Sequence, residues 1–89
     1  MTTLHITLTN EDKGYQFAQF SEDLEDEYTS GEIYRMLQRE YGRCTSKIYA
    51  DTSNGVQTRG WYFESRQRYE DTNQHYLRAA WCIVVRDDN

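Results

Sequence analysis

The stretch that decides the fold is residues 53–86, SNGVQTRGWYFESRQRYEDTNQHYLRAAWCIVVR. It opens on Ser53-Asn54-Gly55, a combination typical of the turn in a β-hairpin. Two runs rich in aromatic and β-branched residues follow, and the polar residues 70–74 between them indicate a second turn. Another run precedes the first turn. Together they predict a three-stranded antiparallel meander whose strands are residues 43–51, 56–69 and 75–86.

Side chains alternate between the two faces of each predicted strand. Trp61, Phe63 and Ser65 share one face of the long strand. One face of the last strand carries Leu77, Ala79, Trp81, Ile83 and Val85. We expect a helix to cover this aromatic and aliphatic face, because an apolar sheet face must be buried against another layer.

The pairing register between the last two strands has two alternatives. A five-residue loop at 70–74 sets Arg66 opposite Arg78, and like charges that are directly opposed are unfavourable. A tighter turn, shifted by one pair, sets Glu64 opposite Arg78 and Arg66 opposite Tyr76. The sequence leaves both registers open.

A single main helix is predicted before the meander. Thr29-Ser30-Gly31-Glu32 fits a capping box, in which Thr29 caps the helix and Glu32 returns a hydrogen bond to it. A cap at Ser30 is the alternative and shifts the start by one residue. Gly42 is typical of a helix end. The pattern predicts a helix over about 30–41, with an apolar stripe of Ile33, Met36, Leu37 and Tyr41.

The N-terminal part favours strands. Residues 2–9 alternate Leu4, Ile6 and Leu8 with polar residues, which predicts a half-buried strand. A turn at 10–14 then returns residues 15–20 as a second strand. A helix is the alternative, because Phe17, Phe20, Leu24 and Tyr28 recur at helical spacing. The predicted fold is α+β: a small two-layer sandwich in which an antiparallel sheet, made of an N-terminal strand or hairpin and the meander, packs on one main helix.

Charge is distributed unevenly along the chain. Its 89 residues suffice for one domain, 1–89, with a formal net charge of −5. Residues 11–32 contain eight carboxylates and one lysine, a local charge of −7, whereas the remainder is +2. Five of those carboxylates lie in segment 21–28, which is expected to be a loop or a short helix. Such a segment attracts basic surfaces, including surfaces that hold nucleic acid.

The acidic segment has three interpretations. It lacks the Asp-x-Asp-x-Asp-Gly spacing of a calcium loop, so no metal site is expected. It can be a solvated surface with no further role. It can also contact a protein partner that has a basic surface, by mimicry of a phosphate backbone. The candidate partner-binding residues are Glu22, Asp23, Glu25, Asp26, Glu27 and Tyr28.

Two other function classes remain open. Direct binding of RNA or single-stranded nucleic acid would use arginines for phosphates and tyrosines for base stacking, but the net acidity of the chain disfavours it. Its candidate residues are Tyr62, Arg66, Arg68, Tyr76 and Arg78. The other class is a self-associating structural module, a homodimer in which exposed strand edges and aromatic side chains pair two copies.

Catalysis finds no support in the sequence. His5 and His75 have no Asp or Cys partner in a motif, and no phosphate-binding loop or metal-ligand spacing occurs, so no catalytic residues, cofactor or metal are predicted. Apolar runs are too short for a membrane helix, and acidity argues against binding to anionic lipid. Cys44 and Cys82 form no spaced motif, and the N-terminus lacks a secretory signal, which predicts a cytoplasmic location.

The last third of the chain carries a resemblance. Its residues Gly60-Trp61-x-Phe63, Tyr69-Glu70-Asp71 and Trp81 resemble a pattern of small uncharacterised proteins of bacteriophages and bacteria. The resemblance implies a phage or mobile-element origin, and hence a host cytoplasm, but no reaction. In size and charge the chain is also similar to acidic phage inhibitors such as anti-CRISPR and DNA-mimic proteins. The leading hypothesis is a non-enzymatic interaction protein that inhibits or modulates a nucleic-acid-handling protein by binding its basic surface.

Overall fold

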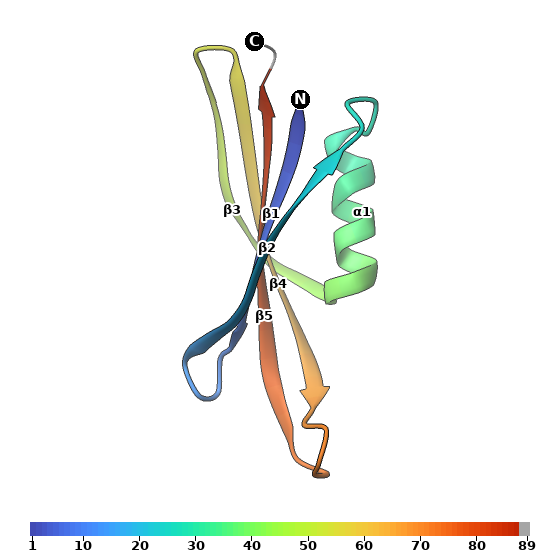
Figure 1. Cartoon of the computed structure of the whole chain (residues 1–89), viewed down its shortest axis with the longest axis vertical. Helices are drawn as coiled ribbons and strands as arrows, with labels where there is room; N and C mark the ends of the chain where they lie inside the picture. Colours follow the sequence, from blue (N-terminus) through green and yellow to red (C-terminus); the bar gives the residue numbers. More distant parts are fainter. Residues whose placement is uncertain (88–89) are drawn as a thin grey trace.

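A twisted five-stranded antiparallel sheet runs the length of the computed structural model (Figure 1). The structure describes residues 1–87, apart from the side chain of Ile48. The strand order is β2-β1-β5-β4-β3, so β2 and β3 form the two edges. The elements are β1 (Thr2–Asn10), β2 (Tyr15–Leu24), α1 (Ser30–Tyr41), β3 (Arg43–Ser53), β4 (Val56–Arg68) and β5 (His75–Asp87). The predicted α+β architecture, with a meander and one main helix, is confirmed.

The N-terminal hairpin is complete. Gly14, at φ 73°, closes the turn with a backbone hydrogen bond to the Asn10 carbonyl of 2.7 Å. The pairing of β1 with β2 then continues without interruption from Ala18 to Leu24, after a register shift at Phe17. The alternative of a helix through Phe17 and Leu24 is therefore wrong. Residues 21–24 of the acidic segment, expected in a loop or short helix, belong to β2 because they pair with the start of β1.

β1 completes the open sheet by pairing along its whole length with β5. This pairing joins the N-terminal hairpin to the meander and brings the two ends of the described chain side by side (Figure 1). The even-numbered residues of β1 face α1, with Leu4 opposite Val84 and Ile6 opposite Cys82. The apolar alternation of the first strand thus supplies one wall of the core.

α1 connects the two edge strands along the chain and packs on one face of the sheet, against β4 and β5. The capping box is present, with Glu32 N–H donating to Thr29 Oγ1 at 3.1 Å and Thr29 N–H donating to Glu32 Oε1 at 3.0 Å. Both bonds satisfy backbone donors that a helix start leaves unpaired. The helix packs on the sheet through one stripe, while Met36 is exposed. The buried core contains Leu4, Ile6, Ile33, Leu37, Tyr41, Trp61, Phe63, Ala80, Cys82 and Val84.

The β4–β5 hairpin takes a register that neither predicted alternative describes. Tyr69 N–H donates to the Gln74 carbonyl at 3.0 Å, so the loop between the strands contains only residues 70–73. Arg66 lies opposite Leu77, and Ser65 lies opposite Arg78. A five-residue loop and a tighter turn were both wrong by one residue. A shift of one residue in register exchanges the faces of every side chain in a strand relative to its neighbour.

The expected covering of the last strand is therefore wrong as well. Trp61 and Phe63 do face the helix, but they share that face with Ala80, Cys82 and Val84. Leu77, Ala79, Trp81, Ile83 and Val85 lie on the opposite face, which no helix covers; Ala79 is buried there by its neighbours, whereas Trp81 is 40% exposed. There the indole contacts Tyr62, with ring centroids 4.4 Å apart in an edge arrangement.

The two cysteines lie on the covered face and are not in a disulfide. Cys82 is fully buried, and this burial raises the pKa of its thiol to about 12. Cys44 is half-buried on β3, which β4 separates from β5. A thiol held protonated in this way packs as a small apolar side chain, because the thiolate is the reactive form.

Both hairpin tips at one end of the sheet extend beyond the helix (Figure 1). Polar contacts hold the tips together there. The buried Asn10 side chain donates to Tyr69 Oη at 2.8 Å, and Asp12 Oδ2 accepts from Leu77 N–H at 3.1 Å. Lys13 lies over the Tyr69 ring, 5.0 Å from its centroid. These contacts replace the apolar cover that α1 gives to the other half of the sheet.

We predict that Gly42→Ala destabilises the protein. Gly42 ends the helix at φ 100°, and a Cβ there would lie 2.6 Å from the Glu64 carbonyl oxygen and 2.8 Å from Ser65 Cβ. The close approach and the positive φ together should lower the free energy of unfolding by about 2–4 kcal/mol, measured by urea denaturation.

The matched control is Gly31→Ala, in the first turn of the same helix. The nearest atom to its added Cβ is Thr29 Oγ1, at 3.9 Å. That substitution should leave stability unchanged or raise it by up to about 1 kcal/mol. Equal stabilities for the two variants would contradict the prediction.

Candidate interaction surface

The acidic segment spans the end of β2 and its connection to α1. Glu22 and Asp23 lie on opposite faces of the sheet near the end of β2, whose pairing stops at Leu24, and residues 25–29 then lead to the helix. All five candidate carboxylates are exposed. The segment lies at the end of the molecule that holds the start of α1 (Figure 1), and its exposed carboxylates project from both faces of the sheet and from the connection.

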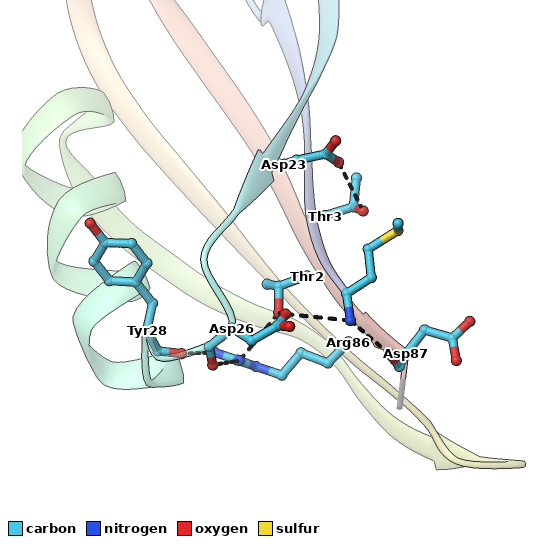
Figure 2. Close-up of polar contacts among 8 residues, drawn as sticks. Thr2, Thr3, Asp23, Asp26, Tyr28, Arg86 and Asp87 are labelled. Atoms are coloured by element: carbon cyan, nitrogen blue, oxygen red, sulfur yellow. Dashed lines mark hydrogen bonds and ion pairs between the residues drawn. The ribbon is translucent and has the colours of Figure 1, made fainter. Parts of the chain in front are cut away.

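Asp26 is engaged within the chain. Its Oδ1 accepts a hydrogen bond from Thr2 Oγ1 at 2.8 Å and lies 3.4 Å from the amino group of Met1 (Figure 2). That amino group also donates to the Asp87 carbonyl at 2.9 Å. Asp26 thus fastens the connection between β2 and α1 to the start of β1.

Arg86 fixes the same connection from β5. Its Nη1 donates to the Asp26 carbonyl at 3.2 Å and to Thr2 Oγ1 at 3.4 Å, and its Nη2 donates to the Tyr28 carbonyl (Figure 2). The Tyr28 side chain is half-buried and packs against the core. A half-buried guanidinium that binds three acceptors holds the backbone of the acidic segment in one conformation.

The environment of Asp26 favours its charged form. The Thr2 hydroxyl, and then the amino group of Met1, lower the pKa of this carboxyl below its ordinary value of 3.8. Because the folded pKa is the lower one, the contribution of Asp26 to stability is present above pH 3.8 and is lost as the pH falls through the folded value. At neutral pH the contacts that hold the connection are therefore fully formed.

The other four carboxylates are unpaired. Within residues 1–87, no cationic group forms an ion pair with Glu22, Asp23, Glu25 or Glu27. Asp23 Oδ1 accepts only a long hydrogen bond of 3.4 Å from Thr3 Oγ1. An open depression of about 660 Å³ lies against the segment, lined by Met1, Thr2, Asp23, Leu24, Glu25, Asp26 and Glu27. The surface thus presents negative charge that the rest of the described chain does not neutralise.

The five candidates for nucleic-acid binding do not form one site. Tyr62, Arg66 and Arg68 lie on the uncovered face of the sheet, whereas Tyr76 and Arg78 lie on the face that carries α1. The observed register causes this split, since it places odd residues of β4 beside even residues of β5. Arg66 and Arg78 therefore do not cluster.

Arg78 has a structural role instead. Its Nη2 donates to Ser65 Oγ and to the Glu40 carbonyl, both at 3.3 Å, and its guanidinium lies 5.3 Å from the centroid of the Tyr41 ring. It thereby links the last turn of α1 to the meander. On the other face Arg66 approaches Asp12 at 3.9 Å, an exposed pair.

On the uncovered face, Tyr62 keeps its proton over a wide pH range. Burial, followed by the negative charges of Glu11 and Glu64, raises the pKa of Tyr62 to about 12. Carboxylates near this tyrosine make its surroundings unfavourable for phosphate. The face that would have to stack on bases therefore carries acidic groups as well as arginines.

Sequence reasoning missed the residues that position the acidic segment. Thr2 and Arg86 act together because β1 pairs with β5, and no local pattern indicates a pairing between residues more than 80 positions apart. The alternation of apolar and polar residues predicted that the first and the last segments are strands, but not that they pair. A cation near the end of the last strand was the only available signal, and it had no predicted partner.

Two further features bear on function. Among the described side chains, no three His, Cys, Asp or Glu residues gather closely enough to hold a metal ion. In the same part of the chain, no helix has the length and apolar character needed to cross a membrane.

We predict that Arg86→Gln loosens the acidic segment. Loss of the charged donor leaves the carbonyls of Asp26 and Tyr28 without their partner, which should lower the free energy of unfolding by about 2 kcal/mol. Amide exchange of residues 25–29 should accelerate in the folded protein. Arg68→Gln, which removes an exposed arginine from β4, is the control and should change neither quantity. Unaltered exchange in the Arg86 variant would refute the role given to this side chain.

Comparison of the chain with protein-family models, with curated proteins and with solved structures finds no match.

Proposed function

We propose that this chain is a non-enzymatic interaction protein whose acidic segment occupies a basic surface of a nucleic-acid-handling protein and thereby inhibits or modulates it. The observation that carries the proposal is the set of four exposed carboxylates without cationic partners in residues 1–87, Glu22, Asp23, Glu25 and Glu27.

The rigidity of the segment supports the proposal. Arg86 binds two carbonyls of the connection, and Asp26 binds Thr2, so the backbone that bears the unpaired carboxylates is fixed before any partner arrives. A preorganised segment avoids part of the entropy cost of ordering on binding. Uncompensated charges also raise the rate of encounter with an oppositely charged surface.

A surface that binds the phosphate backbone is the natural complement of such a segment. Nucleic-acid sites gather Lys and Arg, and they bind by neutralising a row of negative charges. A row of carboxylates competes for the same cations. This role agrees with the resemblance of the C-terminal third to phage proteins and with the similarity in size and charge to acidic phage inhibitors.

Direct binding of nucleic acid has less support. The arginines and tyrosines that it requires are divided between the two faces of the sheet, and the carboxylates of Glu11 and Glu64 lie near Tyr62. A gel-shift measurement with single-stranded RNA should show no complex at micromolar protein and moderate salt. A shift that Arg66→Gln and Arg68→Gln abolish would favour this alternative instead.

The proposal is tested by neutralising the four unpaired carboxylates together, as Glu22→Gln, Asp23→Asn, Glu25→Gln and Glu27→Gln. Asp26 is retained, because its contacts hold the segment. Immobilised wild-type chain should capture a basic protein from a host lysate, and added duplex DNA should displace that protein. We expect the fourfold variant to lose about tenfold or more in affinity for the captured protein and to show a weaker salt dependence.

The control neutralises four exposed carboxylates elsewhere, as Glu40→Gln, Asp51→Asn, Glu70→Gln and Asp71→Asn. Both variants change the net charge equally, from −5 to −1. The control should keep nearly full affinity if the position of the charge matters. Equal loss of affinity in both variants would show that only the net charge matters. Undiminished affinity in the variant of the acidic segment would exclude that segment as the contact.

A further inference from the structure

The two edges of the sheet differ in how they are protected. β3 carries Arg43, Lys47 and Asp51 at intervals of four residues, and its pairing with β4 has two register shifts. Charges and irregularities of this kind prevent an edge from pairing with another chain. β2 has a single register shift, at Phe17, and no charged residue or proline from Tyr15 to Ser21. Its outer backbone groups are therefore open to another strand.

Aromatic rings are exposed along the same edge. Tyr15, Phe17 and Phe20 are 48%, 43% and 42% exposed. Phe17 contacts Tyr15 and Tyr76 through ring edges, with centroids 6.4 and 6.3 Å apart. Tyr15, Phe17 and Tyr76 thus lie together, and Phe20 is exposed further along β2. Large apolar side chains beside an unpaired strand are typical of a surface that another strand covers.

We propose that β2 pairs with β2 of a second copy of this chain, antiparallel and around a two-fold axis at Ala18. A two-fold interface requires a surface that complements itself. In this register the uncharged residues 15–21 lie opposite the same residues of the partner. Lys13, in the turn just before β2, then lies level with Asp23 near the end of the partner's β2, which places two pairs of opposite charge at the ends of the uncharged contact.

Neighbouring registers complement themselves less well. A two-fold axis at Phe17 sets Glu22 opposite Asp12 and Asp23 opposite Glu11, so like charges meet at both ends. An axis at Gln19 brings Lys13 level with Glu25, where neither residue belongs to β2, and sets Glu22 and Asp23 opposite uncharged residues. The axis at Ala18 brings Lys13 level with a carboxylate that is part of β2, and its one like-charged pair, Glu11 and Glu25, lies wholly outside the strand. Opposite charges directly across a strand pair are favourable and like charges are unfavourable, which selects the register centred on Ala18.

The dimer contains one continuous ten-stranded sheet, because each copy adds the five strands of its own sheet. Its two acidic segments lie on opposite sides of the two-fold axis. At about 3.4 Å per residue, their centres are roughly 45 Å apart along the paired strands. Glu25 and Glu27 stay outside the β2 contact. The dimer does not depend on the proposed function, since it is a property of the chain alone. The two proposals share Asp23, and the dimer leaves Glu25 and Glu27 free for a basic partner.

The experiment is sedimentation velocity of the purified full chain over a concentration series. We expect a species of twice the 10.7 kDa chain mass at high concentration. Lys13→Asp and Asp23→Lys each replace two attractive pairs with two repulsive ones, and each should raise the dimer dissociation constant about tenfold or more. The double variant restores opposite charges and should bring the dissociation constant back to within about threefold of wild type.

A lysine at each edge provides the matched comparison. Gln19→Lys puts a charge in the middle of the uncharged stretch of β2 and should abolish the dimer, whereas Thr52→Lys on β3 should leave it unchanged. Both positions are exposed, and thermal unfolding of each variant verifies the fold. Monomer mass at all concentrations, equal effects of the two lysines, or failure of the double variant to restore the dimer would each overturn the proposal. Capture of a basic protein by a monomeric chain would leave the proposed function intact.

Discussion

The loop of residues 70–73 imposes the constraint on which the rest of the structure depends. Its length fixes the register of β4 against β5, and the register fixes which side chains share a face. Phe63 consequently lies with Cys82 and Val84 beneath α1, while Tyr62 lies with Trp81 on the uncovered side. One residue more or fewer in this loop would place Trp81 in the core and would require a different helix position.

Local chemistry was enough to predict the elements but not their faces. The capping box at Thr29, the alternation of Leu4, Ile6 and Leu8 and the Asn54-Gly55 turn each act within a few residues, and each structure formed where it was predicted. The hairpin register depends instead on the length of the loop, which the pairing of Tyr69 with Gln74 sets at four residues. A loop one residue longer or shorter changes every pair between β4 and β5, and no local sequence pattern distinguishes these alternatives.

The candidate site shows the same limit. The position of the carboxylates was clear from the sequence, because exposed acidic residues before a helix start have a strong compositional signal. The sequence did not indicate, however, that one of these carboxylates is bound within the chain and the other four are unpaired. Asp26 is bound by Thr2 and by the amino group of Met1, and Arg86 holds the backbone beside it, through a pairing of β1 with β5 that only the whole fold creates. The four unpaired carboxylates are those that take no part in these contacts.

The partial cover of the sheet by α1 divides the molecule mechanically. The molecule is 47 Å long and about 20 Å across, and the apolar core occupies only the half beneath the helix. The other half is held by Asn10, Asp12 and Lys13 and by aromatic rings at its surface. Such an end opens at a lower free-energy cost than the core, because polar contacts at a surface add little stability and exclude little water. We therefore expect the two hairpin tips to open together, and before the core around Phe63 does.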